Sequence, residues 1–287
     1  MKKPVVVILI IFFSLTGFDR HRPAYKLYNK SGREVTYRKM IRTFEDADII
    51  LLGELHDNPI AHWLRYEVVG DLFKRSNGRM VIAAEMFEAD NQLILDEYMN
   101  NLITERVFED EAKLWRNYKT DYKPLIDFAR ENSLQVVASN IPRRYANMVF
   151  HGGFQALDEI DNDAKRYIAP LPVDYNPELP GYKSMTKMGN AGHAGENLPK
   201  AQAIKDATMA HFILENWSPG KLLIHFHGSY HSDNFEGIYW YLKQENPDLK
   251  VVTLSTTLQE NTGQLEEEFY GRGDFILGVP ESMTRTY

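Results

Sequence analysis

The chain has 287 residues, of which 44% are apolar and 25% are charged, as is usual for a globular protein with a sizeable core. Its net charge of −7 argues against nucleic acid as a partner, because phosphate backbones are bound by basic surfaces. The absence of cysteine from the sequence excludes disulfides, thiolate metal sites and cysteine nucleophiles.

The first residues have the layout of a secretory signal peptide. Lys2 and Lys3 precede an apolar run over 5–15, and small residues follow it. We predict that residues 1–17 are removed on export, which would change the net charge from −7 to −9 because two lysines and no acidic residues are lost. The alternative is a leader kept as an anchor, although the run is shorter than the roughly 20 residues of a membrane span.

The end of this leader resembles a bacterial lipoprotein box without its lipid-bearing residue. Leu15-Thr16-Gly17 has the start of such a box, but Phe18 stands where the cysteine would be. A lipid anchor on cysteine is therefore impossible for this sequence. We expect the protein to be exported and to reside in the periplasm or elsewhere in the cell envelope of a bacterium.

Short apolar runs alternate with amphipathic stretches through the rest of the chain. The runs predicted to be strands are 48–52, 80–85, 134–139, 222–227, 251–255 and 275–279. The stretches with helical periodicity are 60–74, 122–131 and 202–215. Continuous apolar runs suit strands buried on both faces. The pattern predicts one α/β domain over 18–287, with a mainly parallel central sheet flanked by helices.

Two stretches interrupt the alternation. Residues 91–120 have a helical pattern with aromatic patches, and residues 158–198 are rich in proline and glycine. We predict a smaller helical subdomain or insertion around 91–120 and 155–215, with a long mobile loop over 158–198.

Polar residues follow the first predicted strand. Glu54 and His56 lie two residues apart, so in an extended segment they face the same side. Asp57 or Asn58, followed by Pro59, is explained as the start of a helix. Glu54 and His56 precede this cap, and in open α/β sheets ligands bind at the carboxyl ends of strands. We therefore interpret these two residues as part of a site.

A second Gly-x-x-His motif follows the strand predicted at 222–227. His225 and His227 alternate with Phe226 and share a face, and Gly228 is followed three residues later by His231. The repetition of this motif after two strands favours a functional role. The alternative is that at least one of these histidines is a hydrogen-bonded core residue.

Glu85 ends another predicted strand, so we expect it at the same edge of the sheet. A buried carboxylate needs a partner, and Glu54, His56, Glu85 and His231 are predicted to converge there. Such a set suits a divalent metal such as zinc or manganese. It suits a hydrogen-bonded network without metal equally well, and the sequence leaves both open.

Arg143 follows the strand predicted at 134–139. At a carboxyl end, its guanidinium would suit an acidic group of a ligand. The alternative is a surface arginine paired with Asp or Glu.

Several blocks of the sequence together resemble the ChaN-like haem-binding proteins of bacteria. These blocks are LLGELHDNPIAH, AAEMFE, DYKPLIDFAR, VVASNIPRRYA, AQAIKDATMAHFI and HFHGSYH. They occur in the order of the family and span about residues 47 to 255. The wider superfamily is similar to the Tiki and TraB proteins and to erythromycin-esterase-like hydrolases. Its signature of paired Gly-x-x-His motifs with acidic residues maps onto Gly53, Glu54, His56, Glu85, Gly228 and His231.

The resemblance implies an iron-regulated lipoprotein that binds haem during iron uptake. It also implies a parallel sheet flanked by helices, haem held partly by tyrosine, and homodimers that stack haems between subunits. An outer-membrane haem receptor would be a partner. The candidate haem-binding residues are Tyr118, Tyr122, Tyr175, Tyr182, His193 and Arg143. For any single tyrosine the alternative is ordinary packing or exposure on the surface.

Two functional hypotheses follow. The first is an exported protein that carries or stores haem in iron uptake. The second is a hydrolase in which a divalent metal on Glu54, His56, Glu85 and His231 activates water and a glutamate acts as general base.

Overall fold

A computed structural model describes residues 23–188 and 193–287. The predicted signal peptide and Phe18 lie outside these residues. No helix in the described part of the chain is both long enough and apolar enough to cross a membrane.

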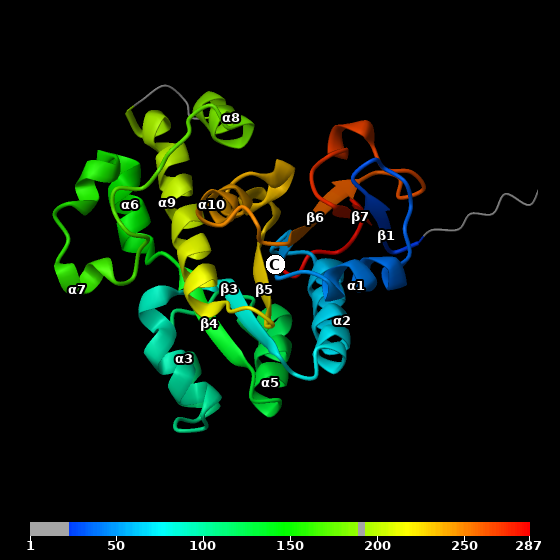
Figure 1. The fold of residues 1–287 in the computed structure, drawn as a ribbon, viewed down its shortest axis with the longest axis horizontal. Coiled ribbons are helices and arrows are strands. Elements are labelled where there is room, and N and C mark those ends of the chain that lie inside the picture. Colours follow the sequence, from blue (N-terminus) through cyan, green and yellow to red (C-terminus); the bar gives the residue numbers. More distant parts are fainter. Residues whose placement is uncertain (1–22, 189–192) are drawn as a thin grey trace, which may run out of the picture.

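The described residues form a central seven-stranded sheet (Figure 1). Its strands are β1 (Lys26–Asn29), β2 (Ile49–Glu54), β3 (Met80–Glu88), β4 (Gln135–Asn140), β5 (Leu222–Gly228), β6 (Val251–Gln259) and β7 (Phe275–Pro280). The order across the sheet is β1-β7-β6-β2-β5-β3-β4. Neighbouring strands are parallel except β1, which is antiparallel to β7. The predicted fold class, a mainly parallel α/β sheet, is confirmed, although β1 makes the sheet mixed.

Helices cover both faces of the sheet (Figure 1). They are α1 (Tyr37–Glu45), α2 (Pro59–Arg75), α3 (Gln92–Met99), α4 (Glu105–Glu111), α5 (Lys123–Glu131), α6 (Arg143–Gly152), α7 (Asn162–Lys165), α8 (Pro180–Met188), α9 (His193–Asn216) and α10 (Ile238–Glu245). Alternate residues of β2 divide between the two cores, as the period of two in a strand requires. Ile50 and Leu52 pack on the side of α1, α2 and α5. Ile49 and Leu51 pack on the side of α9 and α10.

The regions predicted to break the alternation are largely helical. Residues 91–120 contain α3 and α4 and run into a helical turn at Tyr118–Tyr122. Residues 158–198 contain α7, α8 and the start of α9, so much of the predicted loop is helix. Near them, α6 packs against α9 through Tyr145, Val149 and Ile204, which adds helices beyond the layer that covers the sheet (Figure 1).

The chain reverses its direction of travel across the sheet around β2. From β2 it passes through α2 to β3, whereas from β5 it passes through α10 to β6 on the other side of β2. Because α2 and α10 cover opposite faces, the segments that follow β2 and β5 leave towards opposite faces of the sheet, although the strands stay paired to Glu54 and Gly228. Ligands of open α/β sheets bind at such a point.

Candidate functional site

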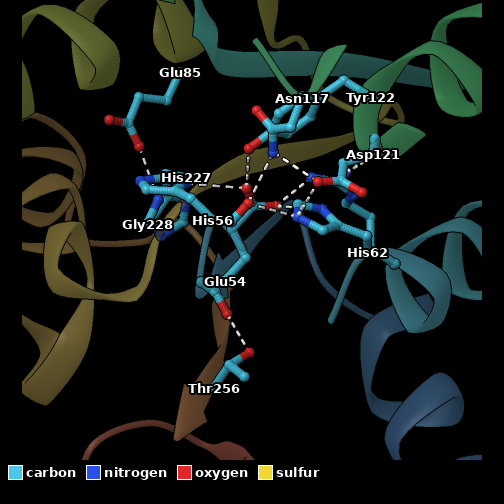
Figure 2. Close-up of polar contacts among 12 residues, drawn as sticks. Glu54, His56, His62, Glu85, Asn117, Asp121, Tyr122, His227, Gly228 and Thr256 are labelled. Atoms are coloured by element: carbon cyan, nitrogen blue, oxygen red, sulfur yellow. Dashed lines mark hydrogen bonds and ion pairs between the residues drawn. The ribbon is translucent and has the colours of Figure 1, made fainter. Parts of the chain in front are cut away.

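An open cleft of about 650 Å³ lies at the carboxyl ends of β2, β3 and β5. Its walls include both Gly-x-x-His segments and parts of α8, α9 and β6. The principal side chains are those of Glu54, His56, Glu85, Met185, Gln202, Lys205, Tyr230, His231, Asp233, Arg272 and Tyr287. Figure 2 shows how the side chains from β2 and its neighbours meet below this cleft.

Glu54, the last residue of β2, is buried and held by three partners. It forms an ion pair with Arg65, accepts a hydrogen bond from the Tyr122 hydroxyl at 2.7 Å, and lies 3.1 Å from His56 Nδ1. Burial alone would raise the pKa of Glu54, but the charge of Arg65 and the contact with His56 lower it to about 2. Glu54 is therefore ionised, and it orients the His56 ring.

Helix α2 and the turn before α5 supply the surroundings of this pair (Figure 2). Arg65 also donates to the Asp121 carbonyl at 2.6 Å. The His56 carbonyl accepts from His62 Nε2 and from Asn117 Nδ2, both at 2.9 Å. The backbone at His56 is thus fixed from two directions.

His231 lies between two carboxylates. Its Nε2 is 3.2 Å from Glu85 and its Nδ1 is 2.5 Å from Asp206, which also accepts from the Tyr182 hydroxyl at 2.7 Å. Burial would lower the pKa of His231, but the charges of Glu85 and Asp206 raise it to about 10. Glu85 also accepts from the Gly228 N–H at 2.7 Å, and its pKa is held well below the usual range. His231 is therefore an imidazolium at neutral pH.

The glycines of the two motifs allow the motifs to pack against each other. A Cβ on Gly53 would lie 2.8 Å from the backbone of Ser229, and a Cβ on Gly228 would lie 2.7 Å from His56 Nε2. The glycine of each motif thus leaves space for a residue of the other, which explains why both motifs begin with glycine.

His225 and His227 are fully buried and make a separate hydrogen-bonded chain. Their Nδ1 atoms are 2.9 Å apart, and their Nε2 atoms lie 2.8 Å from Ser139 Oγ and Ser232 Oγ respectively. Burial lowers the pKa of both rings, that of His227 to about 3. Both are satisfied core histidines, the alternative that the sequence left open.

The structure brings together the four residues predicted to converge, Glu54, His56, Glu85 and His231, as two imidazole–carboxylate pairs. Among residues 23–188 and 193–287 no group of three His, Asp or Glu side chains is placed so that it could hold a metal ion. Arg65 lies beside Glu54, and His231 lies beside Glu85.

Most of the tyrosines proposed as haem ligands lie away from the cleft surface. Tyr118, Tyr122 and Tyr182 are buried, and the last two donate to Glu54 and Asp206. Tyr175 is partly buried and packs against Phe154 and Tyr182.

The other two residues proposed to bind haem are His193 and Arg143, and neither is seen to line the cleft. His193 begins α9, but its side chain is outside the described structure. Arg143 is exposed at the start of α6 and does not line the cleft. Its neighbour Arg144 binds Asp90 at 2.5 Å instead.

Several residues of the site were not predicted from the sequence. Arg65 and Asp206 come from helices, Arg272 precedes β7, and Tyr230 and Tyr287 are 42% and 50% exposed. The available signal for Asp206 was a carboxylate at helical spacing from the apolar residues Ala203, Ala210 and Ile213 of the stretch 202–215.

A family model described as "Haem-binding uptake, Tiki superfamily, ChaN" matches residues 40–242. Among solved structures, the ChaN of Campylobacter jejuni, described as binding haem cofacially, is similar with a TM-score of 0.67 and 19% identity. That match covers 88% of this chain and 96% of the other. A Bacillus cereus protein is similar with a TM-score of 0.52 and 12% identity, over 90% and 95% of the two chains.

A curated relative is also similar in sequence. It is the chloroplastic protein RETICULATA-RELATED 5 of Arabidopsis thaliana, 24% identical over 192 residues. The match covers 61% of this chain but only 25% of the relative, so the chain matches about a quarter of the relative's length.

Proposed function

Because this chain belongs to the ChaN family of haem-binding uptake proteins in the Tiki superfamily, we propose that it binds haem in the cleft at the carboxyl edge of its sheet. We further propose that it is an exported protein of the bacterial cell envelope that carries or stores haem during iron uptake. The observation that carries the haem proposal is the cleft. The carboxyl ends of β2, β3 and β5 form this cleft, and the family match spans all three strands.

The cleft has properties that suit a haem. Its volume of about 650 Å³ falls within the ~300–1,000 Å³ of ligand pockets. Leu55, Met185 and the rings of Tyr230 and Tyr287 provide apolar surface. Both tyrosines are exposed, and the Tyr230 hydroxyl donates to the Gly181 carbonyl at 2.7 Å, a bond that iron binding would replace. Phenolate is a known axial ligand of haem iron. Tyr230 or Tyr287 would therefore hold the iron, and bound haem would supply the metal centre and its visible absorption.

Titration of residues 18–287 with haemin tests this proposal. A saturable shift of the Soret band is expected, and Tyr230→Phe or Tyr287→Phe should alter its position. The matched control is Tyr118→Phe, because Tyr118 is buried away from the cleft. Absence of any saturable spectral change in the unmodified protein would overturn the haem proposal. Retention of an unchanged band in both cleft variants would rule out both phenols as ligands.

We also propose that two chains associate on binding haem and that an outer-membrane receptor exchanges haem with the protein. The solved relative from Campylobacter jejuni is described as binding haem cofacially, which supports stacking of two haems between two subunits. Light scattering with and without haemin should show a rise from monomer to dimer at one haem per chain. A monomer at saturation would contradict the stacked arrangement.

A second candidate function is hydrolysis, favoured by the two imidazole–carboxylate pairs that border one open cleft. His56, oriented by Glu54, would take a proton from water as the water attacks a carbonyl carbon. As the bond from that carbon to the leaving alcohol or amine breaks, His56 would give the proton to the leaving group.

This second candidate is tested by assaying ester and amide hydrolysis in the purified protein, with zinc and manganese measured alongside. Activity that is lost in His56→Gln but kept in His211→Gln, a partly buried residue of α9 outside the cleft, would support it. Equal rates in all three proteins would exclude it.

A further inference from the structure

Two basic side chains line the cleft, and among the described residues neither has a carboxylate within hydrogen-bond distance. They are Lys205 on α9 and Arg272 in the turn before β7, which come from opposite sides of the fold (Figure 1). The ion pairs of the described residues include Arg272 with Asp233 at 3.7 Å, beyond hydrogen-bond distance, and include none for Lys205.

The acidic residues of the cleft other than Asp233 lie beside cations other than Lys205 and Arg272. Glu54 is paired with Arg65, and Glu85 shares His231 with Asp206. Asp57 lies 3.2 Å from Arg285. These pairs leave the charges of Lys205 and Arg272 available to a ligand.

Asp233 is a weak counter-charge for Arg272. Burial raises the pKa of Asp233 to about 6, so it loses much of its charge in mildly acidic solution. The groups that face it are the Ser255 hydroxyl at 2.6 Å, the Arg272 guanidinium and the more distant Glu236 carboxylate. A stronger anion would therefore compete well for Arg272.

Arg272 is held in place by its own surroundings. Its carbonyl accepts from the Asn234 N–H at 2.8 Å, and its guanidinium lies 4.5 Å from the centre of the Phe269 ring. Asn234 and Phe235 have φ angles of 60° and 61°, in the left-handed region that a phenylalanine rarely adopts. This turn therefore fixes the backbone of an arginine that has no strong partner of its own.

Lys205 is positioned by the helix that holds His231. Gln202, Lys205 and Asp206 are spaced three and four residues apart on α9, so they share one face of the helix. Asp206 binds His231, and Gln202 lies within hydrogen-bond distance of the same ring. Lys205 is thus directed to the same cleft as His231.

We propose that Lys205 and Arg272 form a two-point anion site for the paired carboxylates of an amphipathic ligand. The inference rests on the proposed function in one respect, since haem supplies such a pair in its two propionates. The two residues position the ligand and take no part in binding the iron.

The test compares four ligands: haemin, iron-free protoporphyrin IX, and the dimethyl ester of each. The unmodified protein should bind both dicarboxylates at least 10-fold more tightly than their esters. A charged hydrogen bond contributes about 1.5–3 kcal/mol, so Lys205→Gln and Arg272→Gln should each weaken dicarboxylate binding roughly 10-fold or more. Binding of the esters should be unchanged. Lys119→Gln and Arg75→Gln are controls, because both residues lie outside the cleft.

The outcomes separate this inference from the haem proposal. Equal affinity for acids and esters in the unmodified protein would overturn the anion site and leave haem binding intact. Tight binding of protoporphyrin IX but not haemin, lost in the two variants, would support the anion site and overturn the haem proposal. If none of the four ligands binds, both are overturned. Arg272→Lys, with circular dichroism as a check on folding, should restore part of the affinity, and a folded variant that restores none would contradict a role through charge.

Discussion

Gly228 has so little free space around it that a single methyl group tests the packing of the two motifs. In Gly228→Ala the new Cβ would lie 2.7 Å from His56 Nε2, and the ring is tied to Glu54 on its other side. We expect the free energy of unfolding to fall by about 1–3 kcal/mol, the usual effect of overpacking. Chemical denaturation measures this change.

Gly70→Ala is the matched control for this substitution. Gly70 lies inside α2, and nothing lies within 4 Å of the position of its Cβ. Alanine is the better helix former, so the same change there should raise the free energy of unfolding by roughly 0.5–1 kcal/mol. Equal effects at the two positions would contradict the close contact of the motifs.

Arg65 tests how strongly the site depends on a buried charge. Arg65→Met would leave the Glu54 carboxylate buried beside Tyr122 without its cation. Removal of one partner of a buried ion pair destabilises proteins by about 3–5 kcal/mol, and we expect a loss of that size in urea unfolding. Arg75→Met removes an exposed ion pair with Glu45 and should leave the free energy of unfolding nearly unchanged. A loss at Arg65 as small as that at Arg75 would contradict the assigned role.

At this scale the sequence predicted the residues that follow strands and not those that come from helices. Glu54, His56, Glu85 and His231 were found because parallel strands end at one edge of a sheet. Arg65 and Asp206 reach the same edge only through the rotation of α2 and α9, which the sequence does not specify. The accessible tyrosines were missed because exposure depends on the tertiary fold.

At the scale of single elements, the start of α2 shows which polar residues after β2 serve the helix itself. The Asn58 side chain accepts from the Ala61 N–H at 3.0 Å and Pro59 follows, so Asn58 is the cap. Asn58→Ala should lower the free energy of unfolding by about 1 kcal/mol, whereas Asn58→Asp should retain most of it. Thermal unfolding measures the difference. Equal losses in both variants would indicate that the amide group matters for some reason other than the cap.

The strands that were predicted contain longer apolar runs than the strand that was missed. The six predicted strands are present, each with apolar residues on both faces. β1 was missed because it is a strand of four residues at the edge of the sheet, where it pairs with β7. The segment 158–198 was interpreted as a loop from its prolines, yet Pro180 is the first residue of α8, a position that proline favours.

The stability of the whole molecule should depend on pH in both directions from neutrality. Glu54 has a pKa lowered to about 2, so its contribution is present above pH 4.5 and is lost as the pH falls towards 2. His227 has a pKa lowered to about 3, and its contribution is lost as the pH falls from 6.5 towards 3. His231 has a pKa raised to about 10, so its contribution is present below pH 6.5 and declines as the pH rises to 10.

Urea unfolding from pH 3 to pH 10 checks this expectation. The free energy of unfolding should be highest near neutral pH and should fall on both sides. In His231→Gln the decline between pH 6.5 and 10 should be much smaller, and the acid side should change as well, because His231 lowers the pKa of Glu85. An unchanged alkaline decline in this variant would show that His231 is not held as an imidazolium.

The chain from Ser139 through His225 and His227 to Ser232 has one more consequence for the native state. With both rings neutral, the proton between the two Nδ1 atoms belongs to either ring, and each choice fixes the direction of the other two hydrogen bonds. The same heavy-atom structure thus accommodates two proton arrangements of opposite polarity. The positions of the heavy atoms do not distinguish these two tautomers, whereas a spectroscopic method that detects protons on nitrogen would.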